Sequence, residues 1–330
     1  MIVKANPAGI LGTGHCVPDQ VWTNKDLEEM MDTSDEWIRS RTGIGARHVA
    51  PKGVNTSDLA TKAGEEALKN AGIKAEDLNL IIVCTLTRPG PAVDGLQSPG
   101  QSPRCQCSGL DLEAACSGFA YGSIIASQFI ENKMYKYILV IGAEILTRVV
   151  NWKDRSSCVL FGDGAGAAVI GPVPSGYGIL GGAMGADGTG GDFLTIPASG
   201  VEMPPTDALR ENGMAYAKMD GKEVYKFAVK AMPHAAELAL KRSELTKEDI
   251  DVLVPHQANI RIIQSAAKRL HVPMEKVFVN IEKYANTSGA SIPIALDEAV
   301  HAGMIHRGDI VCLDGFGAGL TWASLVMKWY

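Results

Sequence analysis

One cysteine in this sequence occupies a position where a thiol could act as a nucleophile. Cys116 lies in "DLEAACSGFAYGS" (111–123), between a strand-like apolar segment and a helix-like segment that begins with small residues. A thiol in the first turn of a helix is close to unpaired backbone N–H groups and to the positive end of the helix dipole. Both effects favour the thiolate, which is the nucleophilic form of cysteine. The small neighbours would also let a substrate come close, so the segment predicts a thiolate nucleophile.

Two other polar side chains occupy comparable positions later in the sequence. His256, in "VPHQANIR" (254–261), ends a short apolar run, and Asn286, in "YANTSGAS" (284–291), stands at a turn. Active sites of α/β proteins collect at the ends of inner strands and at helix starts. We therefore expect Cys116, His256 and Asn286 to share one site. The other cysteines in apolar surroundings are expected only to pack in the core: Cys16, Cys84, Cys158 and Cys312.

An internal repeat indicates the elements that position these residues. "GILGTG" (9–14) recurs as "GILGGA" (178–183), and "KAEDLNLIIV" (74–83) recurs as "TKEDIDVLVP" (246–255), in the same order and at nearly the same spacing. Such ordered matches disfavour the alternative of chance similarity between short apolar segments. Continuous apolar strands such as "LIIVC" suit sheets that are covered on both faces. The repeat predicts two α/β halves related by pseudo-symmetry, residues 1–172 and 173–330.

The composition excludes several classes of protein. The chain has 46% hydrophobic and 21% charged residues, which is typical of a globular protein with a large core. Its apolar runs are too short to cross a bilayer, and the N-terminus lacks a signal-peptide pattern. Seven cysteines without the spacing of a disulfide framework fit a reducing compartment. A net charge of −6 argues against nucleic acid as the main partner. We expect a cytoplasmic protein that binds neither membrane nor nucleic acid.

Six segments of the chain resemble the thiolase-fold condensing enzymes, most closely the β-ketoacyl-[acyl-carrier-protein] synthase III family. They occur in family order, cover nearly the whole chain and read "TSDEWIRSRTGIGARH" (33–48), "DLEAACSGFAYG" (111–122), "FGDGAGAAVI" (161–170), "VPHQANIRII" (254–263), "NTSGASIPIAL" (286–296) and "GFGAGLTWAS" (315–324). The resemblance implies a thiolase-like α/β fold, with the two pseudo-symmetric halves forming a five-layered αβαβα core. It also implies a homodimer that needs no cofactor and no metal.

The same resemblance implies a reaction and assigns roles in it. An acyl group would pass from coenzyme A to Cys116 as a thioester, and would then condense with malonyl-acyl-carrier protein as carbon dioxide is lost. The products would be 3-oxoacyl-acyl-carrier protein and coenzyme A, and the reaction would start type II fatty-acid synthesis. Neutral His256 and the Asn286 amide would hydrogen-bond the thioester oxygen on which enolate charge develops. The backbone N–H groups of Cys116 and Ala318 would form a second oxyanion hole for acylation.

Further binding residues are implied by position within the family's motifs. Indole and guanidinium groups suit the adenine and phosphates of coenzyme A, and a local basic patch suits an acidic carrier protein. A solvated charged surface is the alternative for both groups. The expected coenzyme A and pantetheine contacts are Trp37, Arg41, Arg155, Gly221 and Asn259, and the expected carrier-protein contacts are Lys226, Arg261, Lys268 and Arg269.

One stretch does not fit the family. The family has a helix within 87–110, at its dimer interface, but residues 88–104 carry four prolines and three glycines, which break helices. Three explanations remain open: an irregular loop, a metal or redox feature at "CQC" (105–107), or a segment read out of frame, which we favour because its length is preserved. Because the family's primer pocket includes this region, the sequence does not define the length or branching of the primer.

Other functions compete with this interpretation. Cysteine hydrolases of the papain type also use Cys, His and Asn in this order, but their tryptophan-bearing signature does not surround Cys116. A thiolase proper would require a second active-site cysteine, and Asn286 stands where a different residue is expected for that chemistry. A priming enzyme of a polyketide or other secondary pathway shares all three residues and is the strongest rival. An inactive binding homologue is the remaining alternative.

Overall fold

Two β-sheets form the framework of the molecule, a computed structural model that describes residues 4–88 and 107–330. The larger sheet has the strand order β1-β7-β6-β4-β5, and the smaller has the order β11-β12-β13-β8. In each, a pair of parallel strands (β4 with β6, and β11 with β12) continues into antiparallel neighbours. The repeats predicted from sequence fall on equivalent strands, because β1 and β8, β4 and β11, and β6 and β12 hold matching places in the two sheets.

The elements up to the end of the first sheet are β1 (Ala8–Cys16), β2 (Val21–Thr23), α1 (Asn24–Met30), α2 (Asp35–Thr42), β3 (Ala46–His48), α3 (Thr56–Ala71), β4 (Leu80–Cys84), β5 (Ser108–Leu112), α4 (Gly118–Glu131), β6 (Ile138–Ile145), α5 (Arg155–Cys158) and β7 (Asp163–Pro172). The remaining elements are β8 (Gly178–Ala186), β9 (Leu194–Thr195), α6 (Asp207–Glu211), β10 (Lys218–Met219), α7 (Gly221–Arg242), β11 (Val252–Pro255), α8 (Ile260–Arg269), α9 (Ile281–Tyr284), α10 (Ser291–His301), β12 (Ile310–Gly317) and β13 (Thr321–Lys328). Short 3₁₀ turns join them; one of these, η2 (Ala115–Ser117), contains Cys116, and another, η7 (Ser288–Ala290), contacts its thiol.

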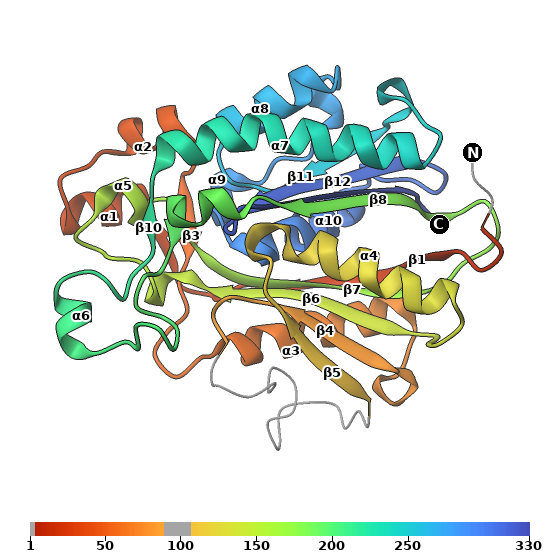
Figure 1. Ribbon diagram of the computed structural model, residues 1–330, viewed down its shortest axis with the longest axis horizontal. Helices are drawn as coiled ribbons and strands as arrows, with labels where there is room; N and C mark the ends of the chain where they lie inside the picture. The colour runs from red at the N-terminus through yellow and green to blue at the C-terminus, as the bar shows by residue number, and fades with distance from the viewer. Residues whose placement is uncertain (1–3, 89–106) are drawn as a thin grey trace.

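Helices cover both faces of each sheet, which gives five layers (Figure 1). Helix α3 covers the outer face of the larger sheet, α7 and α8 cover the outer face of the smaller one, and α4 and α10 lie between the sheets. The strands are apolar on both faces for this reason. On β6, for example, Leu139 and Ile141 pack toward α3, whereas Ile138 and Val140 pack toward the middle layer. The predicted αβαβα thiolase-like fold is confirmed.

The helices begin and end where local chemistry requires. Asn55 and Asp58 form a capping box at the start of α3, and Gly72 ends that helix with a left-handed φ of 65°. Asp220 accepts two backbone N–H bonds at the start of α7. Among the described helices, none combines the length and the hydropathy that a bilayer crossing requires. The unusual stretch that the sequence places at 88–110 lies largely outside the described residues, since 89–106 are not described, and "CQC" falls mostly within that gap.

Candidate active site

Cys116 lies in the turn between β5 and α4, as the sequence predicts. It is the middle residue of η2, and α4 begins two residues later at Gly118. The preceding residue, Ala115, has a φ of +48°, a left-handed conformation that a residue with a side chain adopts only at a cost. The thiol is almost completely buried, and its Sγ lies 3.5 Å from the Ser288 hydroxyl.

The protonation state of the thiol differs from the expectation. Burial raises the pKa of Cys116 to about 12, and the hydrogen bond with Ser288 offsets only part of that effect. Burial thus favours the neutral thiol in the resting site, whereas the helix start alone would favour the thiolate. Cys116 rests as a thiol, and its proton must be removed when it attacks a substrate.

His256 follows β11 and is held on both sides by hydrogen bonds. Its backbone N–H donates to the carbonyl of Asp314 at 2.7 Å, and its Nδ1 lies 2.5 Å from the Ser291 hydroxyl. Ser291 also accepts the N–H of Gln257 at 3.3 Å, so its own proton is free to be donated to Nδ1. The other ring nitrogen, Nε2, is buried and has no hydrogen-bond partner among the described residues. Burial lowers the pKa of His256 to about 3, so the ring is neutral.

Asn286 is fixed by its backbone and by the carbonyl of its side chain. Its N–H donates to the Leu160 carbonyl at 2.9 Å, and its Oδ1 accepts the backbone N–H of Ser288 at 2.8 Å. Because Oδ1 already accepts this hydrogen bond, the group that the side chain can offer to a substrate is its NH₂, which is a hydrogen-bond donor. Asn286 thus offers a donor from a buried turn next to the residue that contacts the thiol.

The end of β12 brings these parts together. A Cβ added to Gly317 would lie 2.6 Å from the backbone nitrogen of Cys116, so only glycine lets the two segments approach this closely. A Cβ added to Gly315 would lie 3.5 Å from both the Cys116 carbonyl oxygen and the His256 Cβ. Ala318 follows directly after the strand. The structure therefore places the expected nucleophile, the imidazole and the turn that carries Asn286 around the end of β12.

A second group of predicted residues lies at the outer end of α2. Trp37 has the guanidinium of Arg41 4.8 Å and that of Arg155 5.2 Å from its ring centroid. Arg155 also donates to the backbone carbonyl of Asp32. Asn259 caps α8 and donates to the Arg41 carbonyl at 3.0 Å, which ties it to the same group. The structure thus brings these four residues together, and Gly221 is the exposed first residue of α7.

The residues expected to dock a carrier protein are spread over α7 and α8. Lys226 pairs with Glu223 at 2.6 Å, Arg261 donates to the Ser40 carbonyl at 2.8 Å, and Arg269 donates to the Val229 carbonyl at 2.8 Å. Lys268 lies exposed in the last turn of α8. These two helices form the outer layer of the smaller sheet (Figure 1).

Three residues of the site were not singled out from the sequence. Ser288 and Ser291 lie inside a motif that stands out only as a whole, and nothing in their types showed that one contacts the thiol and the other the imidazole. Glu144 is different, because it is the one acidic residue of the apolar run "YILVIGAEIL" (137–146). A lone carboxylate in a strand that is buried on both faces is a signal of a special role.

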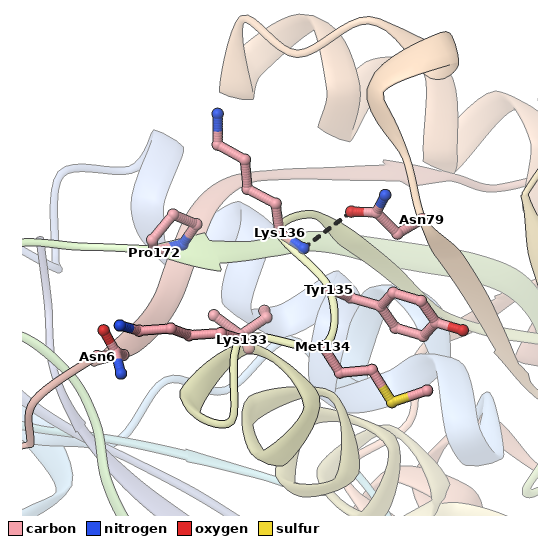
Figure 2. Close-up of a pocket in the computed structure, with 8 residues that line it drawn as sticks. Asn6, Asn79, Lys133, Met134, Tyr135, Lys136 and Pro172 are labelled. Atoms are coloured by element: carbon pink, nitrogen blue, oxygen red, sulfur yellow. Dashed lines mark hydrogen bonds between the residues drawn. The ribbon is translucent and has the colours of Figure 1, made fainter.

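A surface hollow with a cavity volume of about 350 Å³ lies elsewhere, at the far end of α4 (Figure 2). In it the backbone N–H of Lys136 donates to the Asn79 side chain at 2.8 Å. Its lining contains none of the predicted site residues: Asn6, Asn79, Ile130, Lys133, Met134, Tyr135, Lys136 and Pro172. Because α4 has 14 residues that rise about 1.5 Å each, the hollow is about 20 Å from the thiol.

Comparisons with known proteins show which family the chain resembles over its whole length. The family models described as 3-oxoacyl-[acyl-carrier-protein] synthase III and as its C-terminal part match residues 110–188 and 240–329. A β-ketoacyl-[acyl-carrier-protein] synthase III from Caldanaerobacter subterraneus subsp. tengcongensis is 54% identical over 98% of each chain. The solved 3-oxoacyl-[acyl-carrier-protein] synthase III from Aquifex aeolicus VF5 is 41% identical, covers 98% of this chain and 100% of that one, and has a TM-score of 0.89. The solved priming β-ketosynthase of the R1128 polyketide biosynthetic pathway is 34% identical, covers 100% of this chain and 98% of that one, and has a TM-score of 0.87.

Proposed function

The chain belongs to the β-ketoacyl-[acyl-carrier-protein] synthase III family, and we propose that it starts type II fatty-acid synthesis as an acyltransferase with Cys116 as the acyl carrier. The observation that supports this most directly is the placement of a buried thiol, a neutral imidazole with an unpartnered Nε2 and an amide donor around the end of β12. These groups match the two half-reactions of a decarboxylative condensation.

In the first half-reaction the Cys116 sulfur attacks the thioester carbonyl of an acyl-CoA. The carbonyl oxygen gains negative charge, and the N–H groups of Cys116 and Ala318 stabilise it. The close approach of Gly317 to the Cys116 nitrogen supports this assignment, because Ala318 follows Gly317 directly in the chain. The carbon–sulfur bond to coenzyme A then breaks, which leaves an acyl thioester on Cys116 that remains activated for the next step.

In the second half-reaction a malonyl thioester loses carbon dioxide and becomes an enolate. Nε2–H of His256 and the amide of Asn286 hydrogen-bond the oxygen on which this charge develops. The low pKa of His256 suits this role, because a neutral imidazole donates a proton into the bond without giving it up. The enolate carbon attacks the acyl-Cys116 carbonyl, and the 3-oxoacyl product leaves while the cysteine sulfur is regenerated.

The substrates enter past the group around Trp37. We assign Trp37, Arg41 and Arg155 to the adenine and phosphates of coenzyme A, and Asn259 and Gly221 to the pantetheine. The indole with two guanidinium groups over it supports the first assignment. Lys226, Arg261, Lys268 and Arg269 on the outer face of α7 and α8 are assigned to the acidic carrier protein.

We infer the domain division and the oligomeric state from the family as well. The units are the halves 1–172 and 173–330, and the functional form is a cytoplasmic homodimer. No cofactor or metal takes part in the proposed chemistry, because the thioester itself supplies the activation. The priming enzyme of a polyketide pathway remains the second candidate, since the solved one shares 34% of its residues with this chain. Product analysis with acyl-CoA primers of different length and branching separates the two.

The half-reactions can be measured apart. His256→Ala and Asn286→Ala should keep acylation of Cys116, followed by intact mass, within about tenfold of the unchanged protein, and should lower condensation with malonyl-acyl-carrier protein by about 10²-fold or more. His306→Ala, which removes an exposed histidine that pairs with Asp309, is the matched control. Equal losses in both half-reactions for the first two variants would contradict the roles assigned to His256 and Asn286.

A further inference from the structure

Glu144 is a buried carboxylate next to the proposed nucleophile. It lies near the end of β6, has no exposed surface, and faces the middle layer, where η7 packs against the strand. Within residues 4–88 and 107–330 no cation forms an ion pair with it. A charge buried in this way is costly to maintain unless hydrogen bonds compensate it.

The residues that follow β4 supply most of these hydrogen bonds. Thr87 donates its hydroxyl to Oε2 at 2.6 Å, Thr85 does so at 3.4 Å, and the N–H of Leu86 is 3.2 and 3.3 Å from the two carboxylate oxygens. All three are donors, so the environment is built for a carboxylate that can carry charge. Burial nevertheless raises the pKa of Glu144 to about 7, because its effect is larger than that of the hydrogen bonds, which lower the pKa.

A single hydroxyl connects this carboxylate to the nucleophile. The thiol of Cys116 donates to the Ser288 oxygen across 3.5 Å, and the Ser288 hydroxyl donates to Oε1 of Glu144 across 3.2 Å. Both bonds point the same way, from sulfur to carboxylate. His256 is a poor acceptor for this proton, because burial lowers its pKa and its Nδ1 is already hydrogen-bonded with the Ser291 hydroxyl.

The backbone at Ser288 indicates that its hydroxyl is needed there. Its φ is +50°, a left-handed conformation that glycine adopts freely and that costs other residues about 1 kcal/mol or more. Its N–H bond to Asn286 fixes that conformation, and glycine would make the same bond. A serine at a position that favours glycine is explained by what its side chain contacts.

We propose that Glu144 takes up, through Ser288, the proton that Cys116 loses when it is acylated. The Cys116 S–H bond breaks as its proton passes to the Ser288 oxygen, and the hydroxyl proton of Ser288 passes to Oε1 of Glu144. The sulfur forms its bond to the acyl carbon while the bond from that carbon to the coenzyme A sulfur breaks. The proton returns by the reverse path to the departing thiolate, which leaves as free coenzyme A thiol, and Glu144 is ionised again. Glu144 acts through Ser288 and does not touch the substrate.

The inference rests on the proposed acylation but makes a separate prediction about pH. Among the residues that the structure describes, the titratable groups that interact electrostatically with Glu144 are the thiols of Cys84 and Cys116, and Cys84 also interacts with Asp111 on β5. Only an ionised Glu144 can accept the proton, so the acylation rate should rise with pH up to about 7 and then become constant. Without the relay only direct ionisation of the thiol remains, and the rate should continue to rise through pH 9.

The test compares Glu144→Gln and Ser288→Gly with Asp163→Asn as a matched control. Asp163 is also a buried strand carboxylate, but its hydrogen bonds run to Thr147 and to the Ala50 N–H and so bypass the relay. Single-turnover acylation by acyl-CoA is followed by intact mass from pH 5.5 to 9.5.

We expect both relay variants to be slowed on the order of 10²-fold at pH 7 and to lose the constant region of the pH profile, whereas Asp163→Asn keeps the profile of the unchanged protein. Ser288→Gly suits the left-handed backbone, so loss of folding does not explain its effect, and its thermal unfolding verifies this.

Alkylation of Cys116 by iodoacetamide separates this proposal from the proposed function. Peptide mapping reports the alkylation rate of this one thiol at each pH, and no acyl-CoA is needed. The relay predicts the same constant region near pH 7 in the unchanged protein and its loss in Glu144→Gln. If alkylation and acylation of both variants keep the rate and pH profile of the unchanged protein, the relay is wrong. If alkylation follows the relay prediction but no acyl-CoA acylates the protein, the proposed function is wrong and the relay stands.

Discussion

At the scale of single residues, burial decides the chemistry of the site. It keeps Cys116 protonated and His256 neutral, although a helix start beside a thiol suggests a thiolate from sequence alone. The positions of Cys116, His256 and Asn286 could be predicted, because each follows a recognisable apolar strand or turn signal. Ser288 and Glu144 could not be paired from the sequence, because their contact joins residues that are 144 positions apart.

Asp314 on β12 tests how strongly burial acts at one residue. It has no exposed surface, and no side chain among the described residues hydrogen-bonds its carboxylate, while the backbone N–H of Gly315 offsets the effect of burial only in part. Burial raises the pKa of Asp314 well above the usual range. The neutral carboxyl is therefore tolerated at low pH, and the free energy of unfolding falls as rising pH ionises the group. Asp314→Asn should therefore stabilise the protein relative to the unchanged chain at pH 8, by about 1–3 kcal/mol, and less at pH 5.

Urea unfolding at the two pH values measures this difference. Asp192→Asn replaces an exposed carboxylate and is the control. A loss of stability in Asp314→Asn that is equal at both pH values would show that the carboxylate is not the source of a pH-dependent cost.

At the scale of elements, the close contact between β6 and η7 positions the site. A Cβ added to Gly142 would lie 2.0 Å from the Gly289 carbonyl oxygen. This steric clash involves a backbone atom, so no change of side-chain rotamer can relieve it. Gly142→Ala should displace the turn that holds Ser288 and should lower the free energy of unfolding by about 3 kcal/mol or more. Gly188→Ala, where a Cβ would meet nothing within 4 Å, should change it by less than about 0.5 kcal/mol. Chemical denaturation of both variants tests this, and equal stability would show that η7 is not held by the contact.

Elements with clear periodicity could be predicted from the sequence, and close contacts of this kind could not. Helices α3 and α7 have amphipathic patterns and caps, and β4 is a continuous apolar run. The turns η2 and η7 have only three residues each, too few for a period, and their left-handed residues Ala115 and Ser288 are not glycines. Their conformations are imposed by packing between the sheets.

At the scale of the whole molecule, one ion pair links β1 of the larger sheet to α10 in the middle layer. His15 Nδ1 lies 2.6 Å from Oδ2 of buried Asp297, and the Thr13 hydroxyl is 2.6 Å from Oδ1. The hydrogen bond raises the pKa of His15, and the pKa of Asp297 is lowered although burial opposes this. The His15 contribution to stability is thus fully present below its unfolded pKa and is lost as pH rises through the folded one, while that of Asp297 is lost toward acid.

His15→Gln should therefore destabilise the protein most near pH 5, by about 1 kcal/mol, and progressively less toward pH 9. Thermal unfolding across this range measures the effect. His306→Gln, which breaks an exposed pair with Asp309, should change stability little. A destabilisation by His15→Gln that is as large at pH 9 as at pH 5 would exclude the charged pair as its cause.

The two-sheet architecture could be predicted from the internal repeat, because each half repeats the same order of strands and helices. How the two halves face each other was implied by the family resemblance and not by the repeat, because it depends on contacts between the halves such as His15 with Asp297 and Ser288 with Glu144. The primer pocket could not be predicted, since the sequence at 88–110 departs from the family.

Intact-mass spectrometry after incubation with a panel of acyl-CoAs tests the central claim, that Cys116 carries the acyl group. We predict a mass gain of one acyl group in the unchanged protein and no gain in Cys116→Ser. The acyl-CoA that gives the fastest gain also identifies the primer. A gain that persists in Cys116→Ser would contradict the account, and so would the absence of any gain in a folded protein with every acyl-CoA tested.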